Sequence, residues 1–101
     1  TQMDMIRTAP APIAVLLDTE ARYDRIKDVQ AIGDRPQNML LAAHSVGLGA
    51  CWIGRVRDEQ VERVLGAEEH DELMMRIPIG YPAESPAPKE RKPLSELVRR
   101  I

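Results

Sequence analysis

The hydrophobic pattern of the chain is clearest in two runs that predict β-strands. The first, Ala9–Asp18, begins with Pro10 and Pro12 and is then continuously apolar, which is typical of a short strand buried on both faces. In the second, Leu73–Tyr81, apolar residues occupy every other position, which predicts a strand with one buried face. Pro78 lies inside this second run and lacks a backbone N–H, so we expect a bulge or an edge position there.

A helix is predicted between these strands by its end signals. Asp34 is a favourable N-cap, and Pro36 in the first turn breaks no intrahelical hydrogen bond. A start at Asp28 is the alternative, with Pro36 then kinking the helix. Met39–Ala43 is apolar almost all round, which predicts burial on most sides, and Gly47 predicts a left-handed C-cap. The charged stretch before the helix predicts a loop or a frayed helix.

The remaining predicted elements are short. Ala50–Ile53 is expected to be extended, and a helix capped by Asp58 and ended by Gly66 follows it. Pro82–Lys92 is rich in proline and poor in apolar residues, so we expect an extended surface arm, after which Pro93 begins a final helix. The apolar face of that helix consists of Leu94, Leu97, Val98 and Ile101. Because so short a helix is marginal in water, it must pack on another surface.

Composition narrows the class of protein. The 101 residues suffice for one domain, and a formal net charge of −2 gives no general attraction to nucleic acid or to an anionic membrane. One tryptophan, two tyrosines and no phenylalanine are too few for a base-stacking surface. No apolar run approaches the roughly 20 residues that span a bilayer. We therefore expect neither nucleic acid nor a membrane as a partner.

The cysteine content and the N-terminus bear on the location of the protein. Cys51 is the only cysteine, which excludes an internal disulfide and a metal site with several thiolates from one chain. This fits a reducing compartment, and without a signal peptide the expected location is the cytoplasm. The chain begins with Thr1 rather than with methionine, so we expect a processed chain or a piece of a longer one.

Four segments of the chain resemble a known family in their order and spacing. They are Asp34–His44, Gly47–Gly54 (Gly-Leu-Gly-Ala-Cys-Trp-Ile-Gly), Ile77–Pro82 (Ile-Pro-Ile-Gly-Tyr-Pro) and Lys89–Leu94 (Lys-Glu-Arg-Lys-Pro-Leu). Together they are similar to the C-terminal half of the nitroreductase family, the FMN-dependent NAD(P)H oxidoreductases. The similarity extends from about Ala9 to the end of the chain, and Pro36 is a minor departure from the family's pattern.

The resemblance implies an α+β fold, with a mixed sheet flanked by helices in an intertwined homodimer. Two FMN sites would lie at the subunit interface, and a C-terminal arm would wrap the partner. The family's N-terminal half, which binds the FMN phosphate and ribityl chain, is missing here. A fragment is favoured over a site completed by another chain or a form without flavin. Residues 1–101 would then be the C-terminal part of a single domain, with 82–101 as the extended arm and short helix.

The resemblance also implies which residues hold the flavin. Backbone N–H groups at the flavin N5 and carbonyl edge favour the reduced ring, and the amides of Gly54 and Arg55 are the expected donors. Lys89 and Arg91 would contact the phosphate, since arginine offers a planar fork and lysine a point charge. The implied cofactor residues are Trp52, Ile53, Gly54, Arg55, Lys89 and Arg91. The alternatives are a plain strand-to-helix turn with Trp52 in the core, and a solvated surface run at 89–92.

The implied reaction transfers electrons from NAD(P)H through FMN to a nitroaromatic, a quinone or a similar acceptor. Because the cofactor performs the hydride chemistry, no catalytic side chain and no metal ligand is expected. One alternative is a non-catalytic α/β dimerisation or binding module that kept the scaffold but lost flavin. Another is a relative with different chemistry, such as reductive dehalogenation or flavin-consuming biosynthesis.

Four other residues fit structural roles. His44, on the buried helix, is expected to be a hydrogen-bonded packing residue, and His70, in an acidic turn, a solvated loop residue. Cys51 has no cationic neighbour in the sequence and is expected to be buried and unreactive. Tyr81 ends the alternating strand and is expected in the core, with its hydroxyl at the surface.

Overall fold

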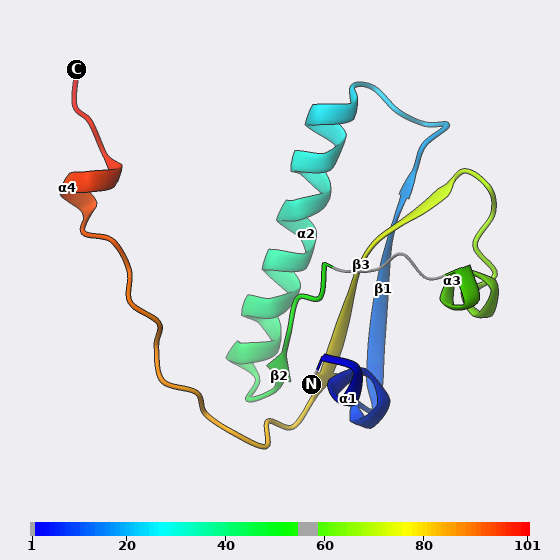
Figure 1. Ribbon diagram of the computed structural model, residues 1–101, viewed down its shortest axis with the longest axis horizontal. Helices are drawn as coiled ribbons and strands as arrows, with labels where there is room; N and C mark the ends of the chain where they lie inside the picture. Colours follow the sequence, from blue (N-terminus) through cyan, green and yellow to red (C-terminus); the bar gives the residue numbers. More distant parts are fainter. Residues whose placement is uncertain (1, 55–58) are drawn as a thin grey trace.

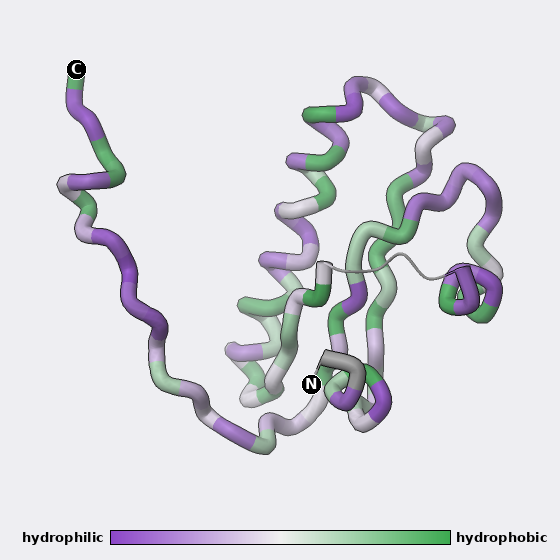
Figure 2. The backbone as a smooth tube through the Cα atoms, viewed as in Figure 1, coloured by the Kyte–Doolittle hydropathy of each residue, from purple (hydrophilic) through white to green (hydrophobic). Residues whose placement is uncertain are grey.

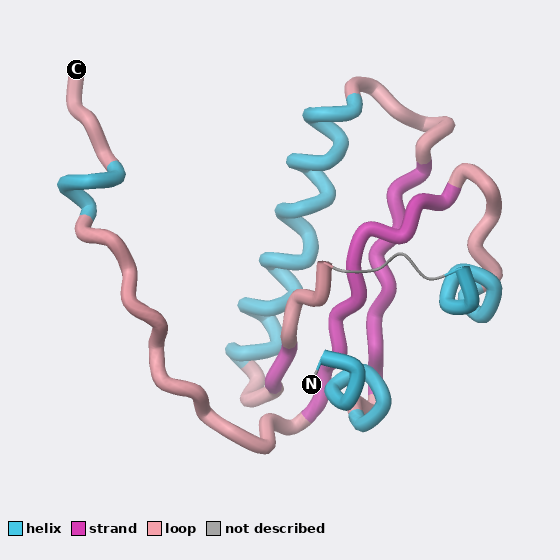
Figure 3. Tube along the Cα trace, in the orientation of Figure 1, coloured by secondary structure: helices cyan, strands magenta, loops and turns pink. Residues whose placement is uncertain are grey.

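The computed structural model describes residues 2–54 and 59–101 and combines helices with one antiparallel sheet (Figures 1 and 3). The helices are α1 (Gln2–Thr8), α2 (Arg25–Ser45), α3 (Glu59–Leu65) and α4 (Leu94–Leu97). The strands are β1 (Ala11–Asp18), β2 (Gly49–Ala50) and β3 (Asp71–Gly80). The α+β fold class is therefore confirmed, although the sequence did not predict α1. Asp58, the predicted cap of α3, lies outside the described residues.

Strand β3 is the central strand of the sheet, whose order is β1-β3-β2. It pairs antiparallel with β1, and Ile13 lies opposite Ile77. The register shifts between Val15 and Leu16, so that Met74 is the extra residue of a β-bulge. The expectation of a bulge or an edge at Pro78 is therefore wrong.

The position of Pro78 still has a hydrogen-bonding explanation. Beyond β2, Ile53 forms an isolated antiparallel bridge with Arg76, and the two residues exchange N–H···O bonds of 3.0 Å in both directions. Because backbone groups alternate in direction along a strand, the nitrogen of Pro78 faces the same side as that of Arg76. On that side the pairing is interrupted between Ala50 and Ile53. The pairs on either side share one register, which places Cys51 opposite Pro78, and the missing N–H of the proline accounts for the interruption.

One face of β3 carries the core. Leu73, Met75 and Ile77 are buried, and Ile77 is 0% exposed, which confirms the half-buried strand. Helix α2 contacts both outer strands and so crosses this face, to which it contributes its three buried residues, Ile32, Pro36 and Ala43. Figure 2 shows the hydrophobic residues concentrated along the paired strands.

Strand β1 is less buried than its continuous apolar run predicts. Ile13, Ala14 and Val15 are half-buried, and Leu16 is exposed. Among the described residues β1 pairs only with β3, and one face of it borders an open apolar hollow. The expectation of a strand buried on both faces is therefore wrong.

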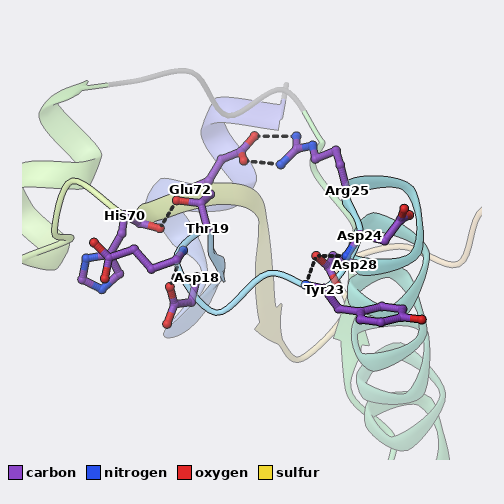
Figure 4. Close-up of polar contacts among 9 residues, drawn as sticks. Asp18, Thr19, Tyr23, Asp24, Arg25, Asp28, His70 and Glu72 are labelled. Carbon is purple, nitrogen blue, oxygen red and sulfur yellow. Dashed lines mark hydrogen bonds and ion pairs between the residues drawn. The ribbon is translucent and has the colours of Figure 1, made fainter.

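Helix α2 begins ten residues earlier than its predicted start, at Arg25 rather than Arg35. Asp24 is the N-cap, and its Oδ1 accepts a 3.1 Å hydrogen bond from the N–H of Lys27. Asp28 Oδ2 accepts the N–H groups of Tyr23 and Asp24 at 3.1 and 3.2 Å (Figure 4). These reciprocal bonds satisfy donors at the end of the helix that otherwise lack partners.

The position of Pro36 and the burial of α2 differ from expectation, whereas the end of the helix agrees with it. Pro36 lies inside the helix and is buried, so tertiary packing compensates for the hydrogen bond that proline removes. Leu41 is 59% exposed, and Ile26 and Val29 are also exposed, so the prediction of burial on most sides is wrong: the described elements cover only one side. Gly47 has φ +80° and ends the helix, which confirms the left-handed C-cap.

The C-terminal arm is extended, as predicted. From Tyr81 to Pro93 the chain forms neither helix nor strand, and it leaves the body of the fold (Figure 1). Helix α4 is a single turn rather than a helix to the end of the chain. Its predicted apolar face is exposed in full: Leu94, Leu97, Val98 and Ile101. None of the described helices is both long and apolar enough to cross a bilayer.

The observed cap gives a direct test of where α2 starts. Replacing Asp24 with Ala removes the side-chain acceptor, so the free energy of unfolding should fall by about 1 kcal/mol, whereas Asp24→Asn should retain most of it. The matched control is Asp34→Ala, at the predicted but unused cap, which should not destabilise because alanine favours a helix interior. Urea unfolding midpoints measure all three. A larger loss from Asp34→Ala than from Asp24→Ala would contradict the observed helix start.

Candidate functional site

The candidate site is built on the chain that leaves α2 and follows the β2 edge of the sheet. The N–H of Gly47 donates to the carbonyl of His44 at 3.1 Å, and that of Leu48 donates to Ala43 at 2.9 Å. This pair of bonds is a Schellman C-cap, which reverses the chain within a few residues. Residues 49–53 then run antiparallel to β3.

Ile53 anchors this segment. Its side chain is 2% exposed, and its N–H and C=O are both bonded to Arg76. The amide of Ile53 is therefore committed to the sheet and is not available to a ligand. Because successive residues of an extended chain direct their backbone groups to opposite sides, the N–H groups of Trp52 and Gly54 face away from β3.

Gly54 is exposed and faces open space. A Cβ built on it meets only one described atom outside its sequence neighbours, Trp52 Nε1, at 3.9 Å. Glycine at such a place leaves room for close approach of a ligand to the backbone. Arg55, the next expected donor, lies outside the described residues.

Trp52 lies between the segment and α2. It is 40% exposed, so it is not the core residue of the alternative interpretation. A Cβ built on Gly33, in α2, would lie 3.7 Å from its Cη2 atom. The indole therefore packs beside the helix at one end and reaches Gly54 with its nitrogen.

The structure does not bring Lys89 and Arg91 to this segment. Both are exposed on the arm, and neither forms a hydrogen bond or ion pair within the described part of the chain. Figure 1 shows the arm separated from α2 along this stretch. In a single copy of the chain, the five described residues of the predicted cofactor set therefore form one group at 52–54 and a distant pair.

Three of the residues assigned structural roles lie elsewhere than expected. His44 is exposed rather than buried, because it lies in the last turn of α2 on the uncovered side. Tyr81 is 89% exposed, because β3 ends at Gly80. Cys51 is half-buried, with Sγ 4.0 Å from the carbonyl of Trp52.

His70 lies in the turn before β3 and is more constrained than a solvated loop residue. Its carbonyl accepts the N–H and the hydroxyl of Thr19 at 2.8 and 2.9 Å (Figure 4). Its ring nitrogens lie 3.6 Å from Glu68 and 3.8 Å from Asp71. No group of three ligating side chains that would suit a metal occurs among the described residues.

The described chain contains a bidentate ion pair that sequence analysis did not find. The guanidinium of Arg25 donates to both carboxylate oxygens of Glu72 at 2.5 and 2.9 Å, which ties the start of α2 to β3 (Figure 4). The hydrogen bond to Glu72, followed by the negative charge of that carboxylate, raises the pKa of Arg25 above its usual value. The partners are 47 positions apart, so no local pattern could have paired them.

An apolar hollow of about 370 Å³ was also missed. It lies on the face of the sheet that carries Arg76, between α1, β1 and α3. Its apolar lining comprises Ile6, Pro12, Ile13, Ala14, Val61, Val64 and Leu65. Helix α3 must come together with the distant α1 and β1 to form it, which a residue pattern does not reveal.

Comparison with known proteins identifies the family. The sequence profile of the nitroreductase family matches residues 1–81, from α1 to the end of β3. The chain belongs to the nitroreductase family. The resemblance that rested on four short segments is therefore confirmed over most of the chain.

Two curated nitroreductase relatives are similar to much of this chain. A Methanothermobacter thermautotrophicus protein, provisionally named an NADH dehydrogenase/NAD(P)H nitroreductase, is 38% identical over 86 residues, which cover 79% of this chain and 45% of that protein. The NADPH-flavin oxidoreductase of Vibrio harveyi is 34% identical over 85 residues, which cover 80% of this chain and 35% of that protein. The chain thus spans less than half the length of these relatives.

Solved structures agree with the fold. The crystal structure of a provisionally named nitroreductase from Desulfovibrio desulfuricans, in complex with FMN, matches with a TM-score of 0.82 and 38% identity. The match covers 92% of this chain and 55% of that one. A nitroreductase-like arrangement of helices and sheet is therefore shown for this chain.

Proposed function

We propose that this chain supplies one wall of an FMN site in an NAD(P)H-dependent oxidoreductase that reduces a nitroaromatic, a quinone or a similar small acceptor. The observation that carries the proposal is the open approach to Gly54, whose backbone N–H faces away from the sheet. The family and the flavin-linked names of its relatives support FMN and NAD(P)H as the cofactor and electron donor.

The segment 52–54 offers backbone hydrogen-bond donors of the kind that the edge of a flavin ring accepts. FMN, when bound, supplies the hydride chemistry, and the protein orients the ring and sets its electronics. The N–H of Gly54 would donate to the electron-rich edge of the ring, and Arg55 would provide the next backbone donor. Ile53 holds this strand on β3 and contributes through that anchoring rather than through its amide.

Lys89 and Arg91 would bind the phosphate after the arm has closed on a second subunit. Two observations support this step: the arm is extended and exposed, and the apolar residues of α4 have no cover in a single chain. If those apolar residues were buried on a partner subunit, Lys89 and Arg91 would move with the arm toward that subunit. The active form would accordingly be a homodimer in which each arm contributes to a shared interface.

We also propose that residues 1–101 are the C-terminal part of one nitroreductase domain, with 82–101 as its arm. The chain spans 45% of its Methanothermobacter relative, and much of α2 lacks cover among the described residues. A lone cysteine without a disulfide fits a reducing compartment, and the proposed location is the cytoplasm. The competing possibility is a scaffold that dimerises but no longer holds flavin.

Flavin content separates the oxidoreductase from that scaffold. The natural gene product that contains these residues should be yellow when purified, and NADH or NADPH should bleach it without oxygen. A colourless product that binds no added FMN would establish the scaffold alternative. The 101-residue chain, prepared alone, should hold far less FMN than the whole product. If it is folded, dimeric and fully loaded, the proposed domain organisation is wrong while the proposed function stands.

A larger side chain at position 54 tests whether FMN docks against the backbone of Gly54. Gly54→Val should weaken FMN binding at least tenfold, because the added carbons would occupy the space that the ring approaches. The unfolding midpoint should change little, since among the described residues a Cβ there would approach Trp52 Nε1 alone, at an ordinary 3.9 Å. Ala83→Val, which adds similar bulk to the exposed arm, is the matched control. Equal FMN dissociation constants for the two variants, measured by flavin fluorescence, would exclude docking at Gly54.

The phosphate contacts are tested by comparing cations within the arm. Lys89→Ala and Arg91→Ala should each raise the FMN dissociation constant about tenfold, as expected for a lost charge-assisted hydrogen bond. Lys92→Ala and Arg100→Ala are the controls and should change it less than twofold. The effect should shrink as salt increases, because salt screens the attraction. Equal small effects from all four variants would favour a solvated charge run.

A further inference from the structure

We infer that Trp52 contributes to ligand specificity at the proposed flavin site, by offering its indole N–H as a side-chain donor beside the amide of Gly54. The inference rests on the proposed function and extends it. It assigns to Trp52 a polar role, whereas the family resemblance implies only that the residue lines the flavin edge.

The indole of Trp52 lies near a glycine at each of its two ends. Its Cη2 lies 3.7 Å from the Cβ position of Gly33, so the six-membered ring rests beside α2. Its Nε1 lies 3.9 Å from the Cβ position of Gly54. The ring therefore extends from beside the helix to the open side of Gly54.

The indole N–H of Trp52 is available to donate a hydrogen bond to a ligand. Within the described part of the chain, Trp52 Nε1 forms no hydrogen bond to a protein acceptor. An indole N–H normally finds a partner when it is buried. The ring is 40% exposed, so water can serve it in the free protein, and a ligand that displaces this water must offer an acceptor in its place.

The chemistry of indole decides which ligands are favoured. Its N–H donates and has no acceptor function, and the amide of Gly54 also only donates. A planar ring whose edge carries adjacent acceptors, such as a carbonyl oxygen beside an unprotonated nitrogen, matches both groups. An edge that presents an N–H would leave donors facing each other, so Trp52 should favour ligands whose docking edge carries only acceptors.

Trp52→Phe is the variant that isolates the donor, because phenylalanine keeps an aromatic ring beside Gly33 and removes the N–H. In the FMN-binding gene product, it should raise the FMN dissociation constant three- to tenfold, the range of one neutral hydrogen bond. Tyr23→Phe, at an exposed position near the start of α2, is the control and should leave the dissociation constant unchanged.

A second measurement does not depend on how the variant folds. In isotope-labelled wild-type protein, the indole N–H resonance absent from Trp52→Phe should shift downfield when FMN binds. If FMN binds without moving that resonance, or if Trp52→Phe retains the affinity of the wild type, the inference is overturned while the proposed function stands. If no form of the wild-type protein binds FMN, the proposed function fails and this inference fails with it.

Discussion

Burial of one face of β3 is the constraint on which the rest of the structure depends. Ile77 is fully buried, and β3 is the strand that pairs on both sides. Removing apolar surface from water contributes about 25 cal/mol per Å², so this face fixes which side of the sheet α2 must cover. With β3 in place, its outward hydrogen bonds orient Ile53, and Ile53 in turn directs Gly54 away from the sheet. The proposed ligand-facing edge is thus a consequence of strand pairing.

The parts of this arrangement that the sequence predicts are those set by local chemistry. Apolar residues at every other position of β3 were enough to identify its buried face, because side chains of a strand alternate. Gly47 was enough to predict the left-handed end of α2, since φ +80° is strained for residues with a Cβ. The family resemblance singled out Trp52 and Gly54, and the structure brings these two residues together beside α2.

The parts that could not be predicted depend on contacts between distant residues. Pro36 indicated a helix start, yet the reciprocal bonds of Asp24 and Asp28 begin α2 earlier and packing accommodates the proline. The pairing of Ile53 with Arg76 decides which amides are free, and no spacing in the sequence encodes it. The apolar residues of α2 indicated burial, but what covers its outer side is not among the described residues.

The two prolines that lie opposite each other in the sheet, Pro12 and Pro78, have different consequences. Pro78 occupies an interior gap in the ladder, whereas the nitrogen of Pro12 faces the open side of β1, because opposed residues of a non-hydrogen-bonded pair direct their backbone groups apart. An exposed strand edge is a template on which other chains can add and aggregate. Pro12 removes one donor from the edge of β1 that no described strand covers. That edge is therefore a poorer template for the addition of another strand, which disfavours aggregation.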